Sequence, residues 1–104
     1  MKKIIERLAY ENIIRLEADV NYTKVFYIDG GMDTVCHTLK VFESNLKNEG
    51  FIRVHKSCIV NVRHVLRVCY KKHTVLLKGE SQIKIARRRV KETILVLTQV
   101  VQAA

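Results

Sequence analysis

Apolar and polar residues alternate along much of this 104-residue chain, a pattern typical of short strands with one buried face. In one such segment, positions 14, 16 and 18 are apolar whereas Arg15 and Glu17 are charged. Farther on, Gly30-Gly31 predicts a hairpin turn, because glycine reaches positive φ at little cost. The strands expected from these patterns cover residues 13–18, 22–29, 32–37, 51–55, 59–61, 65–70, 74–78 and 82–86, with an added edge strand at Lys2–Ile5.

Two segments repeat apolar residues at helical spacing instead. Leu39, Phe42 and Leu46 follow Thr38, a residue suited to cap a helix, so residues 39–48 are predicted to form a short amphipathic helix that stops before Gly50. The tail has apolar residues at 90, 94, 97 and 101, which predicts a second helix over Val90–Gln102. At this length, one domain over residues 1–104 is expected, built mostly of short strands.

Charge is distributed unevenly along the chain. Residues 1–52 carry seven Lys/Arg and eight Asp/Glu, whereas residues 53–104 carry twelve Lys/Arg and two Asp/Glu. The second half therefore has a balance of +10, within a net charge of +9 for the whole chain. Such an asymmetry predicts one polybasic face, and phosphate backbone is the commonest partner for it. A merely soluble basic surface is the alternative that charge alone leaves open.

The cysteines and carboxylates argue against a metal site and against catalysis. The chain has three cysteines, Cys36, Cys58 and Cys69, and no C-x-x-C motif. This odd number favours a reducing, cytoplasmic compartment, in which the cysteines act as small residues of the core or sheet. Their spacing to histidines is not that of zinc fingers or ribbons, so no metal and no cofactor are expected. Acidic residues are scarce in the basic half and no paired carboxylates stand out, so we expect no enzyme. No stretch is long and apolar enough to predict a membrane span.

The stretch F-I-R-V-H-K-S-C-I-V-N over residues 51–61 is the most informative feature. Its sequence closely resembles the signature of the LytTR family, the DNA-binding output domains of bacterial response regulators. Two weaker motifs precede and follow it in the expected order. Ile14–Ala18 with Asn21-Tyr22 is similar to the family's I-x-x-I-E-A…N-Y start, and residues 85–91 are similar to V-S-R-R-Y-x-K, with Ala86 and Arg89 departing from that pattern. The resemblance covers about residues 12–97.

The resemblance implies a mostly β fold, a sandwich of small antiparallel sheets with one short internal helix and a C-terminal helix. It implies sequence-specific binding to double-stranded DNA at promoter direct repeats, with loops reading successive major grooves of a bent duplex. The family's base-reading positions fall here on the loop Thr23–Lys24, on Lys56 and on Arg88. The expected DNA-binding residues are Asn21, Tyr22, Thr23, Lys24, Arg53, His55, Lys56, Ser57, Asn61, Arg63, His64, Arg87, Arg88 and Arg89.

The resemblance also sets the expected context of the domain. Most family members carry an N-terminal receiver domain of a two-component system, and none is evident in this sequence. The chain is therefore expected to be an excised output domain or a small stand-alone transcription regulator, acting in the cytoplasm and forming a homodimer on DNA.

Two other function classes stay open from the residues alone. A single-stranded DNA or RNA-binding β module would need exposed aromatic rings as stacking platforms, for which Tyr22, Phe26, Tyr27 and Tyr70 are the strand candidates. A protein-interaction domain would use the apolar C-terminal tail to dimerise.

Overall fold

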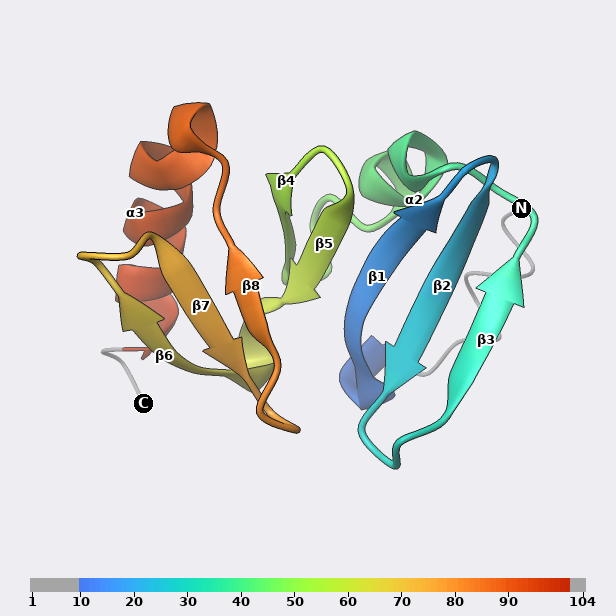
Figure 1. Cartoon of the computed structure of the whole chain (residues 1–104), viewed down its shortest axis with the longest axis horizontal. Coiled ribbons are helices and arrows are strands. Elements are labelled where there is room, and N and C mark those ends of the chain that lie inside the picture. The colour runs from blue at the N-terminus through green and yellow to red at the C-terminus, as the bar shows by residue number, and fades with distance from the viewer. Residues whose placement is uncertain (1–9, 102–104) are drawn as a thin grey trace.

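The computed structural model describes residues 10–101, so the edge strand expected at Lys2–Ile5 lies outside the described residues. Two sheets, two α-helices and three 3-10 helices make up this part of the chain (Figure 1). The strands are β1 Ile13–Asp19, β2 Tyr22–Tyr27, β3 Met32–Val35, β4 Phe51–His55, β5 Cys58–Asn61, β6 Val65–Cys69, β7 Thr74–Leu77 and β8 Gln82–Lys84. The helices are η1 Tyr10–Asn12, α2 Leu39–Asn45, η2 Val62–His64, η3 Arg87–Arg89 and α3 Val90–Val101.

All strand pairs are antiparallel. A five-stranded sheet has the order β3-β2-β1-β5-β4, and a three-stranded sheet has the order β6-β7-β8. The mostly β fold class expected from the sequence is thus confirmed, with a short internal helix and a C-terminal helix in their expected places. The central strand β1 pairs with β2 on one side and with β5 on the other, so residues 41 to 45 positions apart in the sequence are neighbours.

Two apolar clusters form the core, one on each face of the five-stranded sheet. Phe42 of α2 is fully buried against β1, β2 and β5, so α2 covers one face. The other face packs on the three-stranded sheet and on α3 through residues such as Val60, Val75 and Leu97. Because both faces of the five-stranded sheet are covered, all four residues of β5 are buried. In β1 the pairing register with β2 shifts between Ile13 and Arg15, and Ile14 and Leu16 lie in different clusters. The single buried face expected from the alternation of residues 14, 16 and 18 is therefore wrong for this strand.

Several expected element ends shift by one to three residues. Strand β2 ends at Tyr27, where the Gly31 carbonyl accepts a hydrogen bond from the Tyr27 amide and Gly30 has a φ of +91°. Helix α2 ends at Asn45, and although Thr38 occupies its N-cap position, the hydroxyl makes no capping hydrogen bond. The three arginines after β8 form the 3-10 helix η3, which leads directly into α3.

Candidate nucleic-acid interface

Three polar segments far apart in the sequence meet at one edge of the molecule. They are the β1–β2 turn, the β4–β5 turn and the 3-10 helix η3, which lie along the top of Figure 1. Backbone hydrogen bonds connect them in a row. The Ala18 amide donates to the Ser57 carbonyl at 2.9 Å, and the Ala86 amide donates to the Val54 carbonyl at 2.8 Å. Strand β4 and its turn thus lie between the other two segments and fix their spacing. We call the β1–β2 turn, the β4–β5 turn and η3 the contact segments.

The β4–β5 turn is held in shape by two side chains of its own strand. Nδ1 of His55 accepts a hydrogen bond from the Ser57 amide at 3.0 Å. Arg53 donates from Nη2 to the Lys56 carbonyl at 2.5 Å and from Nε to the His55 carbonyl at 3.4 Å. These bonds all involve backbone atoms of the turn, and the Lys56 side chain stays exposed at the tip of the turn.

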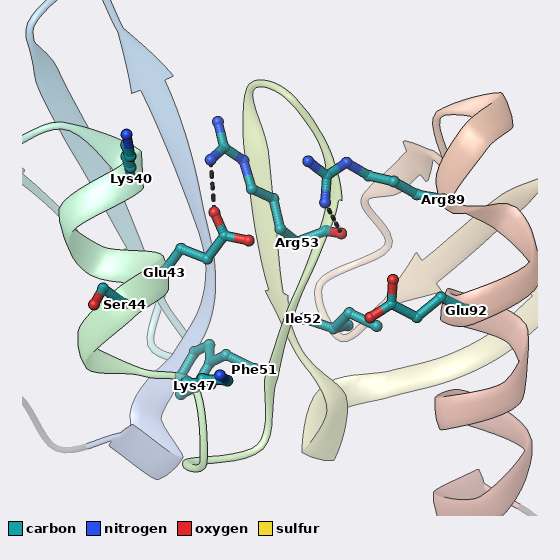
Figure 2. Close-up of a pocket in the computed structure, with 9 residues that line it drawn as sticks. All are labelled: Lys40, Glu43, Ser44, Lys47, Phe51, Ile52, Arg53, Arg89 and Glu92. Carbon is teal, nitrogen blue, oxygen red and sulfur yellow. Dashed lines mark hydrogen bonds and ion pairs between the residues drawn. The ribbon is translucent and has the colours of Figure 1, made fainter.

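Arg53 itself is held from α2 rather than being free for a ligand. Its Nη1 lies 2.8 Å from Oε1 of Glu43, and its side chain is only 16% exposed. Its carbonyl accepts a hydrogen bond at 3.5 Å from Nη1 of Arg89. Figure 2 shows both arginines beside a groove of about 470 Å³ between α2 and α3, with β4 between the helices. The contact between Glu43 and Arg53 is not predicted from the sequence, where Glu43 is one carboxylate on a helix that precedes a basic strand.

Burial of the imidazole lowers the pKa of His55 below its ordinary value of 6.5. The positive charges of Arg53 and Arg89 act in the same direction, whereas the carboxylate of Glu17 opposes them. A neutral imidazole is also the form that can accept the Ser57 amide hydrogen at Nδ1. The neutral ring therefore has its remaining N–H at Nε2.

The β1–β2 turn presents some of its expected residues and buries another. Asn21 and Tyr22 are exposed, and Nζ of Lys24 lies 3.7 Å from a carboxylate oxygen of Asp19. Thr23 is fully buried, and its hydroxyl donates to the His37 carbonyl at 2.7 Å. At the tip, Val20 is 87% exposed and has a φ of +57°, an unusual conformation for a β-branched residue.

Asn61, Arg63 and His64 do not join the contact segments. They lie at the end of β5 that is opposite the β4–β5 turn, although all three are among the DNA-binding residues expected from the sequence. Asn61 is fully buried, where its side-chain amide donates to the carbonyls of Tyr10 and Ile13 and accepts from the Arg63 amide. Nη1 of Arg63 donates to the Glu49 carbonyl, and Nε2 of His64 contacts the Glu11 carbonyl.

The third contact segment presents guanidinium groups. Arg87 and Arg88 are exposed, whereas Arg89 is half-buried and directed toward β4. Three consecutive arginines in a 3-10 helix cannot share one direction, and this division agrees with that expectation. The exposed pair supplies bidentate donors suited to phosphate or to guanine.

Two further observations concern metal-ligating side chains and membrane-spanning helices. Within residues 10–101, no three His, Cys, Asp or Glu side chains gather in a way that could hold a metal ion. In the same part of the chain, no helix has the length and apolar character of a membrane span.

Comparisons with known proteins bear on the family and the fold of this chain. A family profile described as the LytTr DNA-binding domain matches residues 3–97. Among solved structures, the chain is similar to the LytTr DNA-binding domain of a methyl-accepting/DNA response regulator from Bacillus cereus. The TM-score is 0.77 at 24% sequence identity, with 86% of this chain and 84% of that chain covered. At this identity the structural match shows the shared fold. No curated protein matches the chain.

Proposed function

This chain belongs to the LytTR family of DNA-binding domains, and from this premise we propose that it binds double-stranded DNA sequence-specifically through the three contact segments. One observation carries the proposal: hydrogen bonds from Ala18 to Ser57 and from Ala86 to Val54 align the segments along one edge. A row of turns can enter a groove at intervals while the sheets behind it stay rigid. The family is one of DNA-binding domains, so binding rather than catalysis is its activity.

We assign base reading to exposed side chains at the tips of the segments. Lys56 and Arg88 are both exposed, and each can donate to the O6 and N7 acceptors of guanine in a major groove. Lys24 supplies a donor from the β1–β2 segment, and Val20 offers an apolar tip for a thymine methyl group. Arg87, Asn21 and Tyr22 surround these tips and suit phosphate contacts. Thr23 and Asn61 are left out because their side chains are buried.

We also propose a regulatory setting for this binding. The similar Bacillus cereus structure comes from a response regulator, and a DNA-binding output domain fits that role here. In this setting a receiver domain controls the output domain, and two copies bind direct repeats in a promoter. The site of action is the bacterial cytoplasm, where the DNA is.

Single-stranded nucleic acid is the second candidate, and the placement of the aromatic rings disfavours it. Tyr22 is 47% exposed on the five-stranded sheet and Tyr70 is 56% exposed beside the three-stranded sheet, so the two rings do not share a sheet. The Phe26 ring is covered by the guanidinium of Arg15 at 4.0 Å, and the Tyr27 hydroxyl donates to Asp33. A base-stacking platform needs adjacent open rings, and these four do not provide one.

Selection of bound duplexes from a random pool tests the proposal directly. A single enriched consensus, bound more tightly as duplex than as either of its strands, is the expected result. If about six phosphates are neutralised, affinity should fall roughly a thousandfold between 50 and 200 mM salt. No enrichment, or tighter binding of the single strands, would overturn the proposal.

A further inference from the structure

The three-stranded sheet has a basic outer face that the contact segments do not use. Residues that face outward are paired across its strands, Arg67 with Leu76 and Gln82, and Cys69 with Thr74 and Lys84. Arg67, Gln82 and Lys84 are exposed, whereas the alternate residue Val75 is fully buried in the core. The β6–β7 turn adds Lys71, Lys72 and His73, all exposed.

A hollow of about 260 Å³ lies on this face. Its polar lining consists of Arg67, Lys72, Thr74 and Gln82, and no carboxylate among residues 10–101 lines it. Guanidinium, ammonium, hydroxyl and amide groups are the donors that a phosphate group requires. Among residues 10–101, neither Arg67 nor Lys72 forms an ion pair. Both positive charges are therefore free for an anionic partner.

The basic face begins where the contact segments end. The Ile85 amide donates to the His73 carbonyl at 2.8 Å, so the β6–β7 turn is attached to the strand that leads into η3. Arg87 follows Ile85 by two residues. In Figure 1 this turn lies at the left-hand edge, below the start of α3. A partner that reaches Arg87 thus has the β6–β7 turn as its next neighbour.

We propose that this face, made of Arg67, Lys72, Thr74, Gln82 and Lys84, binds backbone phosphates of duplex DNA that flank the base-read site. The inference rests on the proposed function and extends its footprint beyond the three contact segments. Residues 65–91 contain nine Lys/Arg and one acidic residue, Glu80. Only three of those cations belong to η3, so most of this charge lies outside the contact segments. Duplex DNA supplies one, because it carries a negative charge about every 1.7 Å along its axis.

The test compares two duplex lengths. One duplex ends at the site selected by the wild-type protein, and the other extends that site by about one helical turn on each side. The double variant Arg67→Gln/Lys72→Gln removes two exposed cations from the hollow. Its control is Lys47→Gln/Lys78→Gln, which removes the same charge from α2's C-terminal side and from the end of β7 opposite the β6–β7 turn. Binding is measured by fluorescence anisotropy between 50 and 200 mM salt.

The wild-type protein and the control should bind the extended duplex more tightly than the short one. The double variant should lose this length dependence and should bind the short duplex as the wild type does. Its salt slope on the extended duplex should fall by about two, so its affinity deficit shrinks about tenfold between 50 and 200 mM salt.

Each contrary result would overturn either the flanking contact alone or both proposals. A wild-type protein that binds the selected site equally well at both lengths would overturn the flanking contact and leave the proposed function intact. Equal affinity of the double variant and the wild type for the extended duplex would also overturn the flanking contact and leave the proposed function intact. The basic face would then suit an acidic protein surface. Absence of binding to any duplex would overturn both proposals.

Discussion

Oε1 of Glu43 on α2 lies 2.8 Å from Nη1 of Arg53 on β4, so a helix outside the contact segments holds the arginine that braces one of them. The other nitrogens of that guanidinium donate to the His55 and Lys56 carbonyls. We therefore propose that Arg53 sets the shape of the β4–β5 turn rather than contacting a backbone phosphate. We propose that the pair positions Lys56.

Replacing Arg53 by alanine should reduce specific DNA binding while leaving the salt slope almost unchanged. The change removes the donors to two turn carbonyls, but the lost charge is not one that faces the duplex. Arg63→Ala, which removes an exposed arginine at the other end of β5, is the matched control and should change neither quantity. Glu43→Gln should weaken specific binding less and cost under about 1 kcal/mol of unfolding free energy. A salt slope reduced by about one in Arg53→Ala would instead assign Arg53 to a backbone phosphate.

Lys56→Ala and Arg88→Ala should each weaken binding to the selected site far more than binding to unrelated duplex. Both side chains are exposed at the tips of contact segments. A lost base contact costs about 1–3 kcal/mol and relaxes one position of the consensus. Repeating the duplex selection with each variant measures this. Uniform weakening across all sequences would instead make the residue a backbone contact.

Asn61→Ala should destabilise the fold by about 2–4 kcal/mol and leave the DNA consensus unchanged. The substitution leaves the carbonyls of Tyr10 and Ile13 and the Arg63 amide without their side-chain partner. Asn45→Ala, on the exposed surface of α2, should change stability by no more than about 0.5 kcal/mol. Urea unfolding gives the stability and duplex selection gives the consensus. An altered consensus at unchanged stability would return Asn61 to the interface.

His55 should make the protein less stable as the pH falls below neutrality. Its pKa is lowered in the folded state, by burial first and then by Arg53 and Arg89, with Glu17 acting against them. The unfolded state therefore takes up a proton near pH 6.5, before the folded state does, and stability declines from there down to the folded pKa. The contribution is fully present above that window.

Urea unfolding midpoints between pH 7.5 and 5 measure this effect. His55→Gln should show a smaller decline across the window than the wild type, because the variant lacks the titrating group. An identical decline in both proteins would show that other groups cause the pH dependence.

The three cysteines should be dispensable for DNA recognition. Cys58 is buried, and burial raises the pKa of its thiol to about 12, so it should resist a thiol reagent at pH 8 while exposed Cys36 reacts. Replacing all three by alanine should cost about 1–2 kcal/mol, mostly at Cys58, and keep the consensus. Duplex affinity should be the same with reductant, peroxide or chelator. Loss of affinity with peroxide alone, abolished by one substitution, would identify a redox sensor instead.

The sequence by itself determined the elements of the fold and the family. The helical repeat through Phe42 places the apolar side chains of α2 on one face, and the helix could be predicted from that repeat without knowing what covers it. The alternation around Ile14 and Leu16 likewise predicted a strand, although it did not give the face on which each of the two side chains lies. The motif over residues 51–61 is contiguous, so its strand, turn and strand could be read directly. Lys56 and Arg88 are predicted from their motifs to read bases, and both are exposed in the structure.

Tertiary structure alone decided which polar residues are available at the edge. Thr23 and Asn61 look like turn and motif residues, but they hydrogen-bond carbonyls 14 to 51 positions away in the sequence and are buried. Arg53 is held by Glu43 across ten positions, and Arg63 lies at the far end of β5. A period-2 pattern gives the side of a strand on which a residue lies only where the pairing is regular, which it is not between Ile13 and Arg15. It gives neither the position of the residue along the edge of the sheet nor the distant groups that contact it. Those are fixed only when the strands pair and the helices pack.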